Sequence, residues 1–253
     1  MSRPSSDGHV RSVQRGLAAL DLLVAAAPHT VRVCDVADHL EVDQGTASRM
    51  LATLVEAGYA SRTPDRRYTV GPRSLPMAVH WLNRLRRAAE GPMGRVSRAT
   101  GEIVMLSQLL GNVDVPISWL PGRDERPGLP AFDANYPIWA TASGRALLSH
   151  LSPGAQMQLL PPEPYPRLTP LTTRDWTSLR EAIRAGSRRG LHIEQDEVIS
   201  GLWCASVPLE RCAGGEVIAL GVVVAGEPTA RQRARILNTL ADETRDLGFA
   251  LSA

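Results

Sequence analysis

The chain has 253 residues, of which 43% are hydrophobic and 21% are charged, and its formal net charge is only +2. This length suits two ordinary domains with real cores, and the near-neutral charge does not by itself indicate a nucleic-acid partner. No apolar run approaches the ~20 residues that a membrane-spanning helix requires, so the sequence predicts a protein without a membrane partner.

The cysteines are Cys34, Cys204 and Cys212, which lie far apart and form no Cys-x-x-Cys pair. This pattern argues against a disulfide framework and against structural zinc, and it favours a reducing compartment. We therefore expect a cytoplasmic protein with no metal site and no cofactor.

A polar arm is expected over residues 1–9, and the first predicted helix covers residues 12–27. A second helix is predicted over residues 33–40, followed by a short turn at 41–43. The apolar positions of the first helix recur every three or four residues, as expected for a buried stripe. They are Val13, Leu17, Leu20, Leu23 and Val24.

Residues 43–58 predict one amphipathic helix, which Asp43 can cap and Gly58 can end. The face opposite its apolar stripe carries short hydrogen-bonding side chains and one arginine. Such side chains are typical of a DNA recognition helix, which contacts base edges in the major groove. The alternative for this segment alone is an ordinary surface helix. The candidate DNA-binding residues on this helix are Gln44, Thr46, Ser48 and Arg49.

Two short β-prone segments, 59–62 and 67–70, flank a turn-rich tip and predict a hairpin with clustered arginines. Together with the preceding helices they predict a winged helix-turn-helix over residues 10–71. Residues 1–71 carry as many acidic residues as arginines, so DNA affinity would depend on where the charges lie. Beside the helix, the expected phosphate contacts are Arg11, Arg15, Arg62, Arg66 and Arg67.

Residues 72–94 are expected to link two domains, with a helix over 74–90 that ends before Gly91-Pro92. The alternative is another packed helix with a solvated arginine face. From residue 95 to 253 the pattern predicts an α+β domain with a concave face suited to a small molecule. Its expected strands are 103–110, 115–120, 193–200, 202–209 and 217–225, and its expected helices are 141–151, 176–189 and 229–249.

The first domain resembles the N-terminal domain of the IclR family of bacterial transcriptional regulators, and the second resembles that family's GAF-like effector-binding domain. Arg32 and Gly45 depart from the family pattern and would weaken two helix starts. The resemblance implies a homodimer or tetramer with dimer contacts in the linker. The segments that carry it are 12–17, 36–40, 46–54, 58–59, 68–71, 140–148, 190–191, 201–208 and 219–226.

The resemblance also implies an effector pocket for a small organic acid. Amides at a helix start suit a carboxylate, and the nearby tryptophans suggest an effector with an aromatic or otherwise apolar body. The alternative is that the tryptophans belong to the core. The implied pocket residues are Ala142, Ser143, Gly144, Glu194, Cys204, Val223 and Ala225, with Trp119 and Trp203 beside them.

Other chemistry is less well supported, and we expect no enzymatic activity. Cys204 with His192 could suggest a thiol nucleophile, but no orienting partner or oxyanion loop is apparent. His192, Glu194, Asp196 and Glu197 could bind a metal, although a solvated strand edge is the simpler interpretation. The rival class is a small-molecule sensor or a cysteine-dependent enzyme whose helix-turn-helix mediates protein contacts only.

Overall fold

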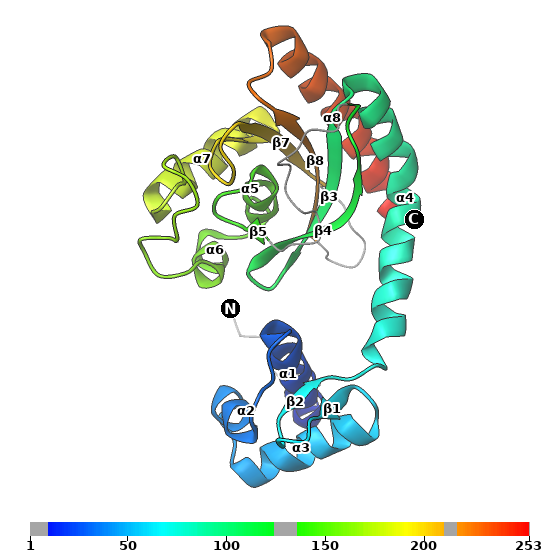
Figure 1. Ribbon diagram of the computed structural model, residues 1–253, viewed down its shortest axis with the longest axis vertical. Helices are drawn as coiled ribbons and strands as arrows, with labels where there is room; N and C mark the ends of the chain where they lie inside the picture. Colours follow the sequence, from blue (N-terminus) through cyan, green and yellow to red (C-terminus); the bar gives the residue numbers. More distant parts are fainter. Residues whose placement is uncertain (1–9, 124–135, 210–216, 253) are drawn as a thin grey trace, which may run out of the picture. The chain divides into compact units, whose positions relative to one another are not determined.

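The computed structural model describes residues 10–123, 136–209 and 217–252 (Figure 1). The chain divides into two compact units, Met1–Trp81 and Leu82–Ala253. The boundary therefore falls inside the predicted linker, and the expected arm over 1–9 lies outside the described residues.

The first unit contains a helix-turn-helix followed by an antiparallel hairpin, as predicted. Residues 60–70, called the wing below, form this hairpin, in which Ala60 pairs with Val70. Val31 adds an isolated bridge to Tyr68. The elements are α1 (Arg11–Ala26), α2 (Val33–His39), α3 (Gln44–Glu56), β1 (Ala60–Arg62) and β2 (Tyr68–Val70).

The predicted buried stripe of α1 is largely wrong. Val13, Leu17 and Val24 are each more than half exposed, whereas Ala19 and Leu23 are fully buried in the core of this unit. Apolar residues occupy two faces of α1, so periodicity alone does not identify the face that packs against the rest of the unit.

The N-termini of α2 and α3, the two helices of the helix-turn-helix, are both capped. The carboxylate of Asp43 accepts a hydrogen bond from the amide of Thr46 at 2.8 Å, as predicted for the start of α3. At α2, where Arg32 was expected to weaken the start, Asp35 accepts from the Arg32 amide at 2.9 Å and from its guanidinium at 2.8 Å. The Asp35 side chain thus takes over a capping role.

The second unit is built on a six-stranded antiparallel sheet with the order β5-β4-β3-β8-β7-β6. One face of the sheet is covered by α5, and the other by α8 (Figure 1). The elements from the linker onward are α4 (Ser74–Thr100), β3 (Ile103–Leu110), β4 (Val113–Leu120), β5 (Tyr136–Pro137), α5 (Ala142–Leu148), α6 (Pro153–Leu159), α7 (Trp176–Arg189), β6 (His192–Gln195), β7 (Leu202–Pro208), β8 (Ile218–Ala225) and α8 (Ala230–Ser252).

The linker helix does not end before Gly91-Pro92, and this prediction is corrected. Helix α4 continues through Pro92 to Thr100. From Leu85 onward, Leu85, Ala89, Met93 and Val96 of α4 are buried at helical spacing. Burial of this stripe outweighs the loss of one backbone hydrogen bond at the proline.

Two further corrections concern the segments around the sheet. The strand predicted over 193–200 ends at Gln195, because the chain turns at Asp196, whose φ is 60°, and turns again at Gly201, whose φ is 86°. The predictions also missed α6, which Ser152 caps by accepting from the amide of Ala155. Within the described part of the chain, no helix is both long and apolar enough to cross a membrane.

Candidate functional site

The exposed start of α3 carries an ordered chain of hydrogen bonds. The carboxylate of Asp43 accepts from the Thr46 hydroxyl at 2.7 Å, and the hydroxyl in turn accepts from the guanidinium of Arg49 at 3.1 Å. Hydrogen bonds from the hydroxyl and the amide of Thr46 hold the pKa of Asp43 below its usual range, so the carboxylate is charged at neutral pH. The three residues recur every third position and therefore follow one side of the helix.

The other predicted contact residues of α3 are also placed for an outside partner. Gln44, Ser48 and Arg49 are exposed, whereas Ala47 and Leu51 on the opposite side are fully buried. A helix with this division presents hydrogen-bonding side chains outward from a fixed base, as a recognition helix requires.

The wing presents its arginines at an exposed tip. Thr63 closes the turn, since its amide donates to the Arg67 carbonyl at 2.9 Å and its hydroxyl to the same oxygen at 3.0 Å. Arg62, Arg66 and Arg67 are exposed. Arg67 forms an exposed ion pair with Asp65 at 3.3 Å, which leaves its charge only weakly compensated. Arg11 and Arg15 are likewise exposed, in the first turns of α1.

In the second unit, a small cavity of about 50 Å³ lies between the sheet and the start of α5. Its floor comes from β3, β7 and β8, and Tyr136 and the loop at Val198 and Ile199 complete its walls. Most of the lining is apolar. The polar groups that line it are Thr141, Ser143, Glu194, Cys204, Ser206 and Tyr136.

The structure brings together five of the predicted pocket residues. They come from four separate stretches of the chain, which meet because β6, β7 and β8 are neighbours in the sheet and α5 lies over them. In the sheet, Cys204 stands opposite Glu194 on one side and Val223 on the other. The five residues that line the cavity are Ala142, Ser143, Glu194, Cys204 and Val223.

The remaining predicted pocket residues do not line this cavity, and the expectation is corrected for them. Trp203 is 1% exposed and lies on the other side of β7, where the guanidinium of Arg233 from α8 stacks over its ring. Trp119 is 47% exposed on β4. Ala225 lines a different, more polar cavity at the end of β8. Successive residues of a strand point to opposite faces of the sheet, so Trp203 and its neighbour Cys204 cannot both face the cavity.

Gly144 supports the site through close packing. A β-carbon at this position would overlap the carbonyl oxygen of Ile138, so α5 approaches the preceding backbone as only glycine permits. We expect Gly144→Ala to lower the free energy of unfolding by about 1–3 kcal/mol, as overpacking does. The matched control is Gly154→Ala in α6, where nothing lies within 4 Å of the added carbon. Denaturant unfolding of both variants measures the difference, and equal stabilities would contradict this assignment.

A buried carboxyl group that the sequence analysis missed lies beside the start of α5. Asp114 is fully buried on β4, and its Oδ2 atom accepts hydrogen bonds from the hydroxyls of Thr141, at 2.9 Å, and Ser143. Burial raises the pKa of Asp114, although the hydroxyls of Ser143 and Thr141 partly oppose this. Asp114 lies just before the strand predicted over 115–120, so the available signal was only an acidic residue beside an apolar β-prone segment.

Glu194 and Cys204 form a second polar group at the cavity, and neither is poised for catalysis. Burial raises the pKa of Glu194, and burial together with the Glu194 carboxyl raises the pKa of the Cys204 thiol well above its usual value. The thiol is therefore protonated at neutral pH, whereas a nucleophilic cysteine needs a lowered pKa. His192 is buried against Gly186 of α7, and burial lowers its pKa to about 4.

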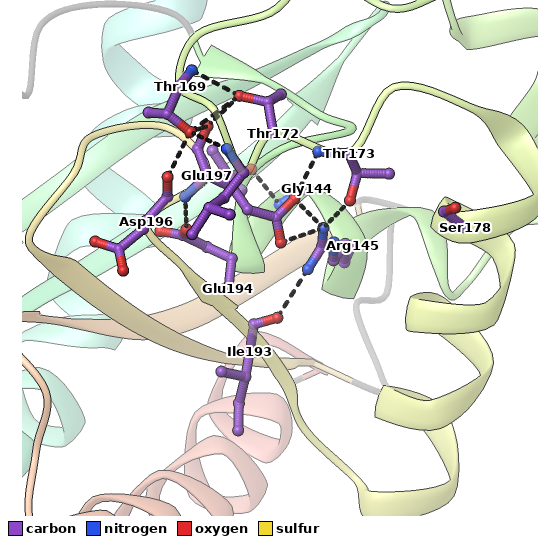
Figure 2. Close-up of polar contacts among 12 residues, drawn as sticks. Gly144, Arg145, Thr169, Thr172, Thr173, Ser178, Ile193, Glu194, Asp196 and Glu197 are labelled. Carbon is purple, nitrogen blue, oxygen red and sulfur yellow. Dashed lines mark hydrogen bonds and ion pairs between the residues drawn. The ribbon is translucent and has the colours of Figure 1, made fainter.

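A buried ion pair fastens the loop of residues 196–201, which carries two cavity-lining residues, to α5. Figure 2 shows the guanidinium of Arg145 contacting the carboxylate of Glu197 at 2.6 Å, the Thr173 hydroxyl at 3.0 Å and the Ile193 carbonyl at 2.9 Å. The amide of Glu197 also donates to Glu194 Oε2 at 3.0 Å. This hydrogen bond connects the loop to the carboxyl group of Glu194, which lines the cavity.

Two hydroxyls strengthen the same attachment from the other side of the loop. Thr172 donates to the carbonyl of Glu197 at 2.6 Å, and Thr169 donates to the carbonyl of Asp196 at 2.5 Å (Figure 2). Of the four residues that could bind a metal, Glu194, Asp196 and Glu197 therefore take part in holding the loop, whereas His192 packs against Gly186. In the part of the chain that the structure describes, no group of three His, Cys, Asp or Glu side chains is arranged to hold a metal ion.

A winged helix-turn-helix joined to an α+β unit with an apolar cavity is typical of DNA-binding regulators that respond to small molecules. Two family models match the chain. The IclR helix-turn-helix domain covers residues 12–64, and the bacterial transcriptional regulator IclR C-terminal domain covers residues 78–251. The chain belongs to the IclR family of bacterial transcriptional regulators.

Individual relatives agree with this family over nearly the full length. The chain is 25% identical to the HTH-type transcriptional regulator XynR of Escherichia coli K12, over 96% of each chain. An IclR family transcriptional regulator from Brucella abortus has a similar fold, with a TM-score of 0.71 at 18% identity over 99% of this chain and 95% of that one. An IclR homologue from Microbacterium hydrocarbonoxydans, complexed with 4-hydroxybenzoate, has a TM-score of 0.62 at 22% identity over 93% and 98%.

Proposed function

We propose that this regulator acts in the cytoplasm as a homodimer, which binds a two-fold-symmetric operator through α3 and the wing of each copy. The observation that carries the proposal is the exposed Asp43–Thr46–Arg49 chain, which orients an arginine on the outer side of a rigid helix. Arginine contacts guanine through two parallel hydrogen bonds, and a pre-oriented guanidinium loses less entropy on binding. A gel shift with the DNA upstream of its own gene tests operator binding.

An exposed apolar surface in the first unit supports the homodimer. Leu17 on α1 is 58% exposed, and Leu75 at the start of α4 is 64% exposed. Large exposed apolar side chains are candidates for an interaction surface, and a symmetric dimer would place one recognition helix in each half-site. The large apolar side chains exposed on α1 and the first part of α4, or next to α1, are Val10, Val13, Leu17, Val24, Leu75 and Val79.

We expect Leu17→Glu combined with Leu75→Glu to shift the protein to a monomer, because each charge would be buried without a partner at the interface. Sedimentation velocity measures the change and also distinguishes a dimer from a tetramer. Met157→Glu, at a side chain 56% exposed on α6, is the control and should leave the assembly unchanged. An unaltered sedimentation coefficient for the double variant would argue against this surface.

The wing arginines are proposed to contact phosphates. Arg66→Ala and Arg67→Ala should each weaken binding to all DNA and reduce the slope of log affinity against log salt by about one per removed contact. Fluorescence anisotropy at several salt concentrations gives the slope. Arg189→Ala, at an exposed arginine of α7, is the charge-matched control. A wing variant with the wild-type slope would contradict the assignment.

We further propose that a small molecule in the cavity controls operator affinity by favouring one arrangement of the protein over another. Support comes from the apolar lining and from the relative that is complexed with 4-hydroxybenzoate. The sequence led us to expect a small organic acid with an apolar body. Its head group would lie near the start of α5, where the hydroxyls of Thr141 and Ser143 contact the buried carboxyl group of Asp114.

The rival function, a cysteine-dependent enzyme, is not favoured by the site. The Cys204 thiol lies beside the Glu194 carboxyl, whose charge opposes formation of a thiolate. A thiol nucleophile needs the opposite surroundings, such as a neighbouring cation or imidazolium.

A further inference from the structure

We propose that Arg32 binds a DNA phosphate, so that the row of phosphate contacts on the wing continues onto the segment before α2. The inference rests on the proposed DNA-binding function, since it adds one residue to the interface formed by α3 and the wing. Three features of the described residues support it: the position of Arg32 beside the wing, the contacts of its guanidinium and the charges around it.

The first feature is that Arg32 stands directly opposite Arg67 of the wing. The segment before α2 forms an antiparallel bridge with β2, in which Val31 and Tyr68 exchange two backbone hydrogen bonds of 2.8 Å. In an antiparallel pair, the residue after one bridge partner lies across from the residue before the other, so Arg32 lies across from Arg67. Val31 and Tyr68 are buried. Their neighbours point the other way, as in any extended strand, and Arg32 and Arg67 are both exposed.

This position suits a contact with the DNA backbone. In a helix-turn-helix, the helix that precedes the recognition helix crosses the backbone, and Arg32 is the residue immediately before that helix, α2. Hydrogen-bonded strands lie about 4.8 Å apart, and successive phosphates of one DNA strand rise by about 3.4 Å along the duplex. Two long side chains at this spacing can therefore reach different phosphates of one strand, Arg67 from the wing and Arg32 from the segment before α2.

The second feature is that the guanidinium of Arg32 is oriented without being covered. Its Nη2 and Nε atoms donate to the two carboxylate oxygens of Asp35, at 2.8 and 3.2 Å. These hydrogen bonds use two of the five N–H donors of a guanidinium, and the Arg32 side chain is 60% exposed. A guanidinium that is already oriented loses less entropy when it binds a phosphate. Arg32 therefore keeps donors for an anion outside the protein.

The third feature is the set of charges around the two arginines. Like charges at opposed positions repel each other in the free protein. Asp35 offsets the charge of Arg32 at 2.8 Å. Asp65 offsets the charge of Arg67 at 3.3 Å. Both ion pairs are exposed and therefore contribute little to stability, so the phosphates of a DNA strand can compete with the aspartates for the guanidinium groups.

Binding of the full-length protein to a labelled duplex of random sequence tests the inference, because a phosphate contact does not depend on the bases. Fluorescence anisotropy at several salt concentrations gives the slope of log affinity against log salt. We expect Arg32→Ala to reduce this slope by about one, and Arg32→Ala combined with Arg67→Ala to reduce it by about two. Arg32→Lys keeps the charge and should keep the wild-type slope. A wild-type slope for Arg32→Ala, or a double variant that loses no more than Arg67→Ala alone, would overturn the proposal.

Asp35→Asn supplies a variant with the opposite expected sign. The hydrogen bonds from Arg32 hold the pKa of Asp35 well below its usual range, so at neutral pH its carboxylate is charged and repels a phosphate bound at Arg32. The asparagine oxygen can still accept from the Arg32 amide, which keeps α2 capped. We expect Asp35→Asn to bind the random duplex at least about twofold more tightly than the wild type.

The matched control is Asp175→Asn, at an aspartate that caps α7 by accepting from the Ser178 amide at 2.8 Å, and it should bind like the wild type. Equal or weaker binding by Asp35→Asn would contradict a phosphate beside Arg32. The outcomes also separate this inference from the proposed function. If the wild type binds no duplex, the proposed function fails, whereas a normal slope for Arg32→Ala in a protein that binds DNA removes only the role of Arg32.

Discussion

Arg49→Ala is expected to cost about 1–3 kcal/mol of operator affinity per half-site, since a bidentate contact between arginine and guanine has this value. Two half-sites double the effect in a dimer. Arg49 is suited to such a contact because it is exposed and its guanidinium is hydrogen-bonded to Thr46. Thr46 is in turn hydrogen-bonded to Asp43. Binding to unrelated DNA should change far less, because the lost contact is to a base. Competition gel shifts with specific and random duplexes measure both affinities.

Two controls separate a base contact from a general effect of charge. Arg184→Ala removes an exposed arginine of α7 and should leave both affinities unchanged. Thr46→Val should weaken specific binding less than Arg49→Ala does, because it removes the hydroxyl that orients the guanidinium but keeps the arginine itself. Equal losses on specific and random DNA for Arg49→Ala would place this residue on the phosphate backbone instead.

Glu197→Ala is expected to destabilise the second unit by about 3–5 kcal/mol, because it leaves the buried guanidinium of Arg145 without its carboxylate partner. The side chain of Arg145 is only 4% exposed, and that of Glu197 is 12% exposed. The same change also releases the amide of Thr173, which donates to Glu197 at 3.0 Å. Chemical denaturation monitored by tryptophan fluorescence measures the loss.

An ion pair of the same length at the surface provides the matched comparison. Arg233 contacts Glu227 at 2.6 Å, but the Glu227 side chain is 67% exposed. Glu227→Ala should therefore cost no more than about 1 kcal/mol. If both glutamate variants lose the same stability, burial does not determine the strength of the Arg145–Glu197 pair, and the loop of residues 196–201 is held by other contacts.

Much of the fold follows from local patterns in the sequence. The α3 helix was predictable because a cap at Asp43, an apolar stripe and a left-handed Gly58 all agree. The continuation of α4 through Pro92 was not predictable from the sequence, because a proline locally predicts the end of a helix. The helix continues because Met93 and Val96 are buried, and that burial exists only in the folded second unit. The turn at Asp196 was missed for the same reason, since the buried ion pair of Glu197 stabilises it.

The candidate sites differ in how far sequence predicts them. The proposed DNA-contacting face lies on one helix and one hairpin, so spacing along the chain was enough to identify its residues. The cavity is assembled from β3, β7, β8 and α5, and its membership depends on which way each strand residue points. Trp203 and Cys204 are neighbours in sequence but lie on opposite faces of β7. Asp114 comes from a strand whose inward face could not be assigned in advance.

The central claim is that α3 of two copies contacts one DNA duplex, and a hydroxyl-radical footprint on the DNA upstream of its own gene tests it most directly. We predict two protected half-sites related by two-fold symmetry, with centres one helical turn of about 10 base pairs or a multiple of that apart. The Arg49→Ala protein should lose both half-sites together. A single protected site, or uniform protection without sequence preference, would contradict the account.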